Sequence, residues 1–553
     1  MAFAKMPFRV LLSAAKLLFI LHHWALPSLI FTSLSVSALN VQILAPGFVN
    51  TPMPSTITLC GPAFATGTEY LNSVYNPTLN FTYFYVYDLS YGNCSSFTDE
   101  TLHMVSQWMY QVRDPNSLTV IVSPSCTYEP YLSQIAAQWN ILLITSTQSD
   151  ITIRDKHLAP TWVSTNIYPA QHYGDAMLNL IQANNWTSVY VVEEDGPLQF
   201  YGLVGPPVKR TFEANGVQLV YLKYDGRKVP LNFTTLLIEF NARSRVMFFF
   251  GPAESLRILL IQAYSRKMTT SEYVYVAAIS FIYKRYGVFT WNKGDKDDLI
   301  VRMAYRSVLL FTAIDLSQDR SANLTSFTAR WRDLYLSDPF YRNQNLRDDP
   351  PTPFLAATEA GLEMLGQVLD EAITGVSSID IWDGADLASA FWGRTFNTTT
   401  GRVSLDKYGD RLPFTSMSYY DGTQFVVFAR SRFDSGSFQW ENIRAVDWHG
   451  SPNFPPNEPY CGYGGDHLRC TEKDESERRT TEIAAVSVAA VAVCVIILAA
   501  CLTYHRWHHN RGLHTQWFVL DPAFLGKKTK SRRSDSLSSL NSAARPFDNT
   551  FIP

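Results

Sequence analysis

The sequence predicts an α/β protein whose parallel sheets form two lobes, followed by one membrane-spanning helix. Three observations predict this class. Short apolar runs alternate with amphipathic stretches across residues 39–455 of the 553-residue chain. The pattern restarts after Tyr168, which indicates two units. A separate apolar run from Ile483 to Tyr504 has no charged residue, and it is long enough to cross a bilayer as a helix.

The first unit is expected to alternate strands with helices. The expected strands are 39–45, 81–87, 118–122 and 141–145, and the expected helices are 98–112, 129–138 and one starting at Gly61-Pro62. The second unit repeats this order, with strands at 188–192, 217–222, 245–251 and 273–277 and helices at 208–215 and 254–266. Such alternation predicts parallel sheets covered on both faces, with a ligand cleft beyond the carboxyl ends of the strands.

Charge and hydropathy predict the topology. The formal net charge of -3 argues against nucleic acid as the main partner. Acidic residues precede the apolar run and basic residues follow it, which predicts an inside C-terminus and an extracellular N-terminus at the plasma membrane. Residues 1–38 read as a signal peptide, and an uncleaved signal anchor is the alternative. The expected order is then ectodomain 39–455, juxtamembrane segment 456–482, span 483–504 and cytoplasmic tail 505–553.

Sequons and cysteines agree with an oxidising, lumenal ectodomain. N-glycosylation sequons all precede the span, at Asn80, Asn93, Asn185, Asn232, Asn323 and Asn397. Cys494 and Cys501 lie in or at the inner edge of the span, and Cys60, Cys94, Cys126, Cys461 and Cys470 lie outside it. Cys461 and Cys470 close a short glycine-containing loop, so we predict a disulfide between them. For Cys60, a free buried thiol and an intermolecular bond both remain open.

Four segments carry a family resemblance across essentially the whole ectodomain. They are Ser123–Thr145 around Cys126 and Trp139, the strand starting at Glu272, the segment Phe396–Arg411 with Asp406, Gly409 and Asp410, and the Cys461…Cys470 loop. Together they resemble the extracellular region of natriuretic-peptide receptors and other receptor guanylyl cyclases. The resemblance implies a two-lobed type I periplasmic-binding-like fold.

The resemblance also implies site residues. It implies a disulfide between Cys94 and Cys126 and a buried chloride, the one cofactor candidate, in the loop at Cys126. The glycine that precedes this cysteine in the family is Ser125 here, a departure at the chloride loop. Trp108 falls where family members place an aromatic residue at a dimer contact, and ordinary helix packing is the alternative. The expected partners are an extracellular peptide or small-molecule ligand, the membrane, and a second copy or a related receptor.

No motif supports catalysis or a metal site. The sequence contains no Walker loop, no Gly-x-Ser-x-Gly and no His-Glu-x-x-His, and His505, His508 and His509 beside Trp507 are interpreted as interfacial residues. The family's kinase-like and cyclase domains need several hundred residues, whereas about 49 follow Tyr504. Within them, residues 517–521 and 530–540 resemble the start of the kinase-like region, with Ser534 and Ser536 as candidate phosphorylation sites, and a disordered solvated tail is the alternative.

These observations predict a single-pass receptor that binds an extracellular ligand without intrinsic catalysis and acts in clearance or modulation. The alternative is a truncated form or fragment of a receptor guanylyl cyclase that makes cyclic GMP when full length. A ligand-gated channel or seven-helix receptor would need further spans, and the hydropathy of the sequence shows none.

Overall fold

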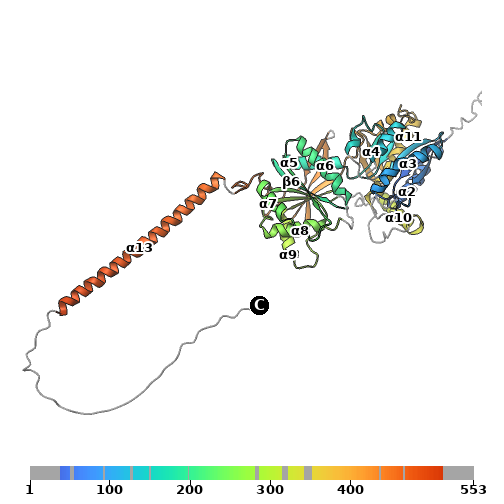
Figure 1. Ribbon diagram of the computed structural model, residues 1–553. Helices are drawn as coiled ribbons and strands as arrows, with labels where there is room; N and C mark the ends of the chain where they lie inside the picture. The colour runs from blue at the N-terminus through green and yellow to red at the C-terminus, as the bar shows by residue number, and fades with distance from the viewer. Residues whose placement is uncertain are drawn as a thin grey trace, which may run out of the picture. The chain divides into compact units, whose positions relative to one another are not determined.

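The computed structural model describes residues 38–49, 55–90, 94–124, 129–147, 151–196, 198–279, 286–313, 322–341, 352–434, 437–464 and 467–514. Two compact units divide the chain, Met1–His467 and Leu468–Pro553. The first unit contains two α/β lobes, and the second contains one long helix, α13 (Leu468–His514) (Figure 1). The expected signal peptide, apart from Ala38, and the tail beyond residue 514 lie outside the described residues.

Lobe 1 is built on a five-stranded parallel sheet in the order β2-β1-β3-β4-β5. Its strands are β1 (Leu39–Pro46), β2 (Leu79–Val86), β3 (Leu118–Ser123), β4 (Leu143–Thr145) and β5 (Trp162–Ser164). Its helices are α2 (Ile57–Tyr75), α3 (Cys94–Gln111), α4 (Glu129–Gln138), η1 (Ile151–Arg154), α10 (Ala322–Ser337), α11 (Pro353–Ile373) and α12 (Gly384–Ser389). An antiparallel hairpin of β11 (Thr395–Thr398) and β12 (Gly401–Ser404) completes this lobe.

Lobe 2 is built on an eight-stranded sheet in the order β15-β14-β13-β10-β9-β8-β6-β7. Strands β10, β9, β8, β6 and β7 run parallel, and β13, β14 and β15 add an antiparallel edge. The strands are β6 (Ser188–Asp195), β7 (Gln218–Asp225), β8 (Val246–Phe250), β9 (Val274–Ile279), β10 (Val308–Ala313), β13 (Thr415–Tyr420), β14 (Phe425–Asp434) and β15 (Ser437–Asn442). The helices are α5 (Ala170–Ala183), α6 (Gln199–Ala214), α7 (Thr234–Arg243), α8 (Ala253–Ser265), α9 (Asp298–Ala304) and η2 (Tyr305–Ser307).

Both sheets are covered on two faces, as the alternating pattern predicts. In lobe 2, α5 and α6 pack on one face and α7 and α8 on the other (Figure 1). Strand β8, Val-Met-Phe-Phe-Phe, is buried at every position, because a central parallel strand has no solvent face. In lobe 1, α2 and α11 cover one face while α3 and α4 cover the other.

The chain crosses between the lobes three times. The first crossover is residues 165–169, between β5 and α5, and the third is residues 412–414, just before β13. The second crossover lies between β10 and α10, and part of it is outside the described residues. Lobe 1 is therefore assembled from two separated stretches of the sequence, and α11 belongs to its core although it follows most of lobe 2.

Three helices begin at least four residues before the prediction, and one of them is α3, which begins at Cys94 rather than at 98. Helix α2 begins at Ile57, so Gly61-Pro62 lies inside it rather than at its start. Helix α6 begins at Gln199 instead of 208, and it contains Pro206 and Pro207. The prolines in α2 and α6 lie beyond the four unpaired amides of the first turn, so each of them removes one i→i−4 hydrogen bond from its helix.

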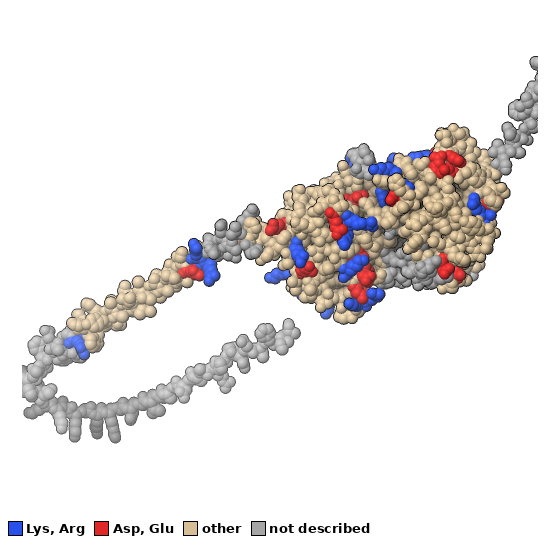
Figure 2. Space-filling view, turned by 45° about the horizontal axis from the view of Figure 1, so that its top comes forward, with Lys and Arg blue, Asp and Glu red and all other residues tan. Residues whose placement is uncertain are grey.

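Helix α13 contains the predicted apolar run. Residues Arg478–Arg511 are long and apolar enough to cross a membrane, and none of this stretch is buried within the chain. Figure 2 shows that the middle of this helix carries no charged side chain.

Candidate functional site

A cavity of about 1210 Å³ is lined by both lobes and by the third crossover, residues 412–414. Lobe 1 contributes η1 and the residues around β12, while lobe 2 contributes the first turn of α5 and parts of β14 and β15. Helix η1 follows the carboxyl end of β4, and α5 follows the carboxyl end of β5. The cavity therefore agrees with the expected position of a ligand site. We call it the hinge cavity.

The wall of the hinge cavity includes the turn Asp406–Arg411, which the sequence singled out as part of a motif. Its conformation depends on Asp406, whose Oδ1 accepts hydrogen bonds from the amides of Tyr408 (2.8 Å) and Asp410 (3.0 Å). Gly409 has φ +73°, and a Cβ there would lie 2.7 Å from Cδ1 of Trp392. Glycine is therefore required at this position by backbone conformation and by space.

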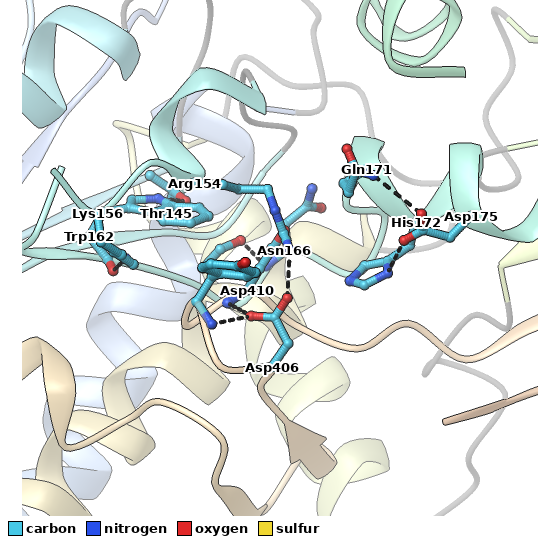
Figure 3. Close-up of polar contacts among 12 residues, drawn as sticks. Thr145, Arg154, Lys156, Trp162, Asn166, Gln171, His172, Asp175, Asp406 and Asp410 are labelled. Carbon is cyan, nitrogen blue, oxygen red and sulfur yellow. Dashed lines mark hydrogen bonds and ion pairs between the residues drawn. The ribbon is translucent and has the colours of Figure 1, made fainter. Parts of the chain in front are cut away.

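Arg154 joins this turn to η1. Its guanidinium contacts Oδ2 of Asp406 at 2.7 Å and also pairs with Asp410 (Figure 3). Both carboxylates are buried. Burial raises the pKa of Asp410, and the charge of Arg154 opposes that shift. A buried pair contributes modest net stability, but removing one partner leaves an uncompensated buried charge.

Arg411, the last residue of the turn, links it to the first crossover. Its side chain is 2% exposed, and Nη1 donates to the carbonyl of Thr165 at 3.1 Å. Burial lowers the pKa of Arg411 to about 10, so the group remains charged at neutral pH. The amide of Ser164 donates to the carbonyl of Gly409 at 2.8 Å, which adds a second bond between β5 and the turn. Arg154, Lys156, Asp406, Asp410 and Arg411 are together called the hinge cluster.

Lys156 lies beside the turn, in a cage made by two indoles. Its Nζ is 4.7 Å from the ring centroid of Trp162 and 5.0 Å from that of Trp392, and it donates to the carbonyl of Trp162 at 2.5 Å. Burial lowers the pKa of Lys156 to about 7, although the charges of Asp410 and Asp406 oppose this shift. The faces of the two indoles also favour the charged amine and so oppose the shift.

His172 on α5 faces the cavity from lobe 2. The side chain is buried, and its ring packs edge-on against Phe433 with 5.5 Å between centroids. Its Nδ1 lies 3.4 Å from Oδ2 of Asp175, one turn further along α5 (Figure 3). Exposed charged residues of both signs, Asp155, Arg402, Lys407, Arg432 and Glu441, complete the lining. The cavity thus offers hydrogen-bonding and ionic groups of both signs to a ligand.

Sequence reasoning found one side of this site and missed the other. Asp406, Gly409, Asp410 and Arg411 belong to a predicted motif, and the structure brings them to the hinge. Arg154, Lys156 and His172 carried no recognisable local signal. Arg154 lies 256 positions from Asp410 in the chain, and only the tertiary fold brings them together.

The cysteines fall into two groups. Cys461 is disulfide-bonded, but the side chain of Cys470 is outside the described residues, so their pairing stays a prediction. The proposed Cys94–Cys126 bond also involves undescribed groups. Cys60 forms no disulfide bond and is fully buried in the cluster that contains Tyr168 and Tyr173, so the intermolecular alternative does not fit its position. Cys494 and Cys501 are free and exposed on α13.

The sequon asparagines with described side chains are Asn80, Asn185, Asn232 and Asn397, and all four are exposed. Asn93 and the side chain of Asn323 lie outside the described part of the chain. Exposure is required for a glycan, so glycosylation remains a prediction compatible with the fold.

The remaining predicted residues are placed as follows. Trp108 is 7% exposed and packs against Phe84, with 5.4 Å between ring centroids. Most of its surface is covered within lobe 1, as the helix-packing alternative expects, and a dimer contact through it stays a prediction. The chloride loop at Ser125 and Cys126 and the phosphorylation candidates Ser534 and Ser536 lie outside the described residues.

Comparisons with known proteins match this architecture. The model of the receptor family ligand binding region matches residues 59–417. Human atrial natriuretic peptide receptor 3 is 23% identical over 56% of this chain and 56% of its own length. Mouse atrial natriuretic peptide receptor 2 is 24% identical over 85% of this chain and 45% of its own. The chain thus spans about half the length of these curated relatives.

A leucine-binding protein, LivK of Thermotoga maritima, aligns in structure with 12% sequence identity, a TM-score of 0.44, and coverage of 71% of this chain and 98% of that one. The family match covers both lobes and all three crossovers. This chain belongs to the receptor family ligand binding region family.

Proposed function

We propose that this chain is a single-pass cell-surface receptor, with its N-terminus outside the cell, that binds an extracellular ligand between its lobes. The chain itself is proposed to perform no catalysis and to clear the ligand or to modulate related receptors as a homodimer or heterodimer. The observation that carries the proposal is the hinge cavity, which both lobes line. Its wall from Ile151 to Phe414 lies inside residues 59–417, which the receptor family model matches, and its wall on β14 and β15 lies after them.

The hinge cavity supports ligand reception because its walls belong to separate lobes. A ligand that contacts both walls favours the arrangement in which they are close, and this population shift is the event a receptor transmits. Charged groups of both signs favour a polar ligand such as a peptide over a lipid. The names of the relatives make atrial natriuretic peptide the first probe to test.

The test uses the full chain in nanodiscs, with fluorescent atrial natriuretic peptide and fractionated peptide extracts as probes. Arg402 and Lys407 are exposed on the cavity wall, so the double change Arg402→Glu and Lys407→Glu should weaken binding at least about tenfold, about 1.4 kcal/mol, without unfolding the protein. Lys228→Glu, in the exposed turn that follows β7, is the control.

Two results would count against the proposal. If neither the peptide nor any extract fraction binds, the proposed receptor function is contradicted. Binding that the double variant leaves unchanged would place the ligand away from the hinge cavity.

A second function is favoured by one comparison. The similarity to mouse atrial natriuretic peptide receptor 2 covers 85% of this chain but only 45% of that receptor. A longer product of the same gene would then carry a cyclase region and make cyclic GMP. Sequencing the 3′ end of the transcript tests this, because an in-frame extension with kinase-like and cyclase sequences would establish it.

A further inference from the structure

We propose that Asn166 and the start of helix α5 form a subsite of the hinge cavity that binds a carboxylate group of the ligand. The subsite deepens the proposed function and rests on it, because it names a chemical group that a ligand of the hinge cavity carries. The C-terminus of a peptide and an acidic side chain share this chemistry, and the experiment below separates them.

The subsite is a small recess of about 10 Å³ that adjoins the hinge cavity. Ile151, Arg154 and Gln171 line both spaces. The wall of the recess also includes Asn166, on the first crossover, and Ala170, the first residue of α5. A space of this size holds about one water molecule. The recess can therefore take one oxygen atom of a carboxylate while the rest of the ligand occupies the hinge cavity.

Asn166 has a fixed orientation and an unused hydrogen-bond donor. Its amide donates to Oγ of Ser164 at 3.2 Å, and its Oδ1 accepts from the amide of Tyr168 at 3.0 Å (Figure 3). Because the amide of Tyr168 is a donor, the oxygen must face it, and Nδ2 is left over. Asn166 is 1% exposed, and its Nδ2 has no hydrogen-bond partner among the described residues. A buried amide without a partner in the wall of a recess indicates an acceptor supplied from outside the chain.

The start of α5 favours a negatively charged acceptor. The helix has 14 residues, no described side chain caps its first turn, and that turn contains no acidic residue. Uncapped amides and the helix dipole together attract anions. His172, in the same turn, is 4% exposed and lines the hinge cavity, and its Nε2 has no hydrogen-bond partner in the part of the chain that the structure describes. A carboxylate has two oxygens, and this turn thus offers unused nitrogen atoms from two buried side chains.

The charges around the recess do not reverse this preference. Asp410 also lines the recess, but it is paired with Arg154. Within the hinge cluster, the charges of Arg154 and Arg411 balance those of Asp406 and Asp410. Asp175, one turn further along α5, is not part of the recess wall. Since a side-chain NH₂ group and backbone N–H groups can only donate, they select a hydrogen-bond acceptor and reject an ammonium group.

Ligand-detected saturation-transfer NMR on the full chain in nanodiscs tests the subsite with three small probes. N-acetylglycine presents the carboxylate of a peptide C-terminus, and N-acetylaspartic acid α-amide presents that of an acidic side chain. N-acetylglycinamide is the neutral control. At least one carboxylate should bind at least about tenfold more tightly than the neutral amide, because charge-assisted hydrogen bonds are the stronger ones. The carboxylate that binds more tightly identifies the source.

Two variants of Asn166 separate the lost donor from added charge. Asn166→Asp keeps an oxygen for the amide of Tyr168 but replaces Nδ2 by a negative oxygen, so carboxylate binding should weaken at least about tenfold. Asn166→Ser also keeps an acceptor for that amide and lacks Nδ2, but it adds no charge, and it should weaken binding as well. Asn215→Asp is the matched control, because this exposed residue at the end of α6 undergoes the same change of charge away from the recess. Its binding should equal that of the wild type.

The thermal midpoint of each variant without probe shows whether it is folded. Three results would overturn the subsite: binding of the neutral amide as tight as that of both carboxylates, wild-type binding by Asn166→Ser, or no binding of either carboxylate, which would leave a water molecule as the occupant. None of them affects the peptide-binding test above, which changes Arg402 and Lys407. A receptor that binds peptide without this subsite and a subsite without a peptide ligand are therefore distinguishable.

Discussion

The apolar contact between the lobes and the hinge cluster beside it are chemically different. Where the amino ends of α2 and α11 meet lobe 2, the contact is apolar: Cys60, Phe354 and Ala357 share one buried cluster with Tyr168 and Tyr173. At the hinge cluster, ion pairs connect η1 to the Asp406–Arg411 turn, and a hydrogen bond connects that turn to the first crossover. Apolar contact is non-directional and insensitive to pH, whereas buried ionic contact fixes geometry and responds to protonation.

This difference suggests a division of roles. The apolar contact supplies most of the association between lobes, since buried aromatic area dominates such interfaces. The hinge cluster sets the angle at which the crossovers leave lobe 1, because Arg154 and Arg411 reach defined oxygen atoms. Four predictions test this division, in order of decreasing effect.

Arg154→Met should have the largest effect. It leaves Asp406 and Asp410 buried without their cation, so we expect a loss of about 3–5 kcal/mol in the free energy of unfolding, measured by urea denaturation. Arg227→Met is the control, because its partner Asp225 is near the surface and Arg227 is 68% exposed, so the free energy of unfolding should be nearly unchanged. Equal effects would show that the hinge cluster is not a buried ionic contact.

Phe354→Ala tests the apolar contact. Phe354 is 7% exposed and lies edge-on to Tyr168, with 6.3 Å between ring centroids, so removing the ring should cost about 3 kcal/mol. The loss should be the same at pH 6 and pH 8, because no titrating group is removed. Leu336→Ala, at a 53% exposed position, should stay within about 0.5 kcal/mol. A pH-dependent loss at Phe354 would contradict the comparison.

Gly409→Ala tests the close packing of the turn. Alanine must adopt φ near +73° and place its Cβ against Trp392, so we expect a loss of about 2 kcal/mol in a thermal or urea unfolding experiment. Gly450→Ala has a positive φ of +92° but open space around it, and it should lose only about 1 kcal/mol. If the two variants lose the same amount, the contact with Trp392 adds nothing.

Lys156→Met should have the smallest effect, visible as a change in pH dependence. The folded pKa of Lys156, about 7, is below its unfolded value of about 10.4, so the unfolded chain binds more protons between these values. Wild-type stability should therefore rise with pH from about 7 to about 10. Partial solvation limits the gain to about 1–2 kcal/mol. Lys156→Met should lack this rise in the free energy of unfolding when urea denaturation is measured at pH 7, 8 and 9. An equal rise in both proteins would contradict the lowered pKa of Lys156.

Much of the fold was predictable because the strands are buried on both faces. Strands such as β3 and β8 read as continuous apolar runs, and the helix α4 matches its predicted bounds, 129–138. The second lobe's antiparallel edge and the return of α11 to lobe 1 were not predictable, because strand order and long-range packing leave no local periodicity. The same limit applied to Trp108, whose burial depends on its neighbours in space.

The sequence by itself determined the α/β class, the apolar helix, and the turn Asp406–Arg411, since each is encoded by residues close together in the chain. Only the tertiary structure decided that this turn meets Arg154 and that Lys156 lies between Trp162 and Trp392. The physical reason is that charge pairing and burial act through space. The pKa of a lysine falls only where side chains from distant segments shield it from water.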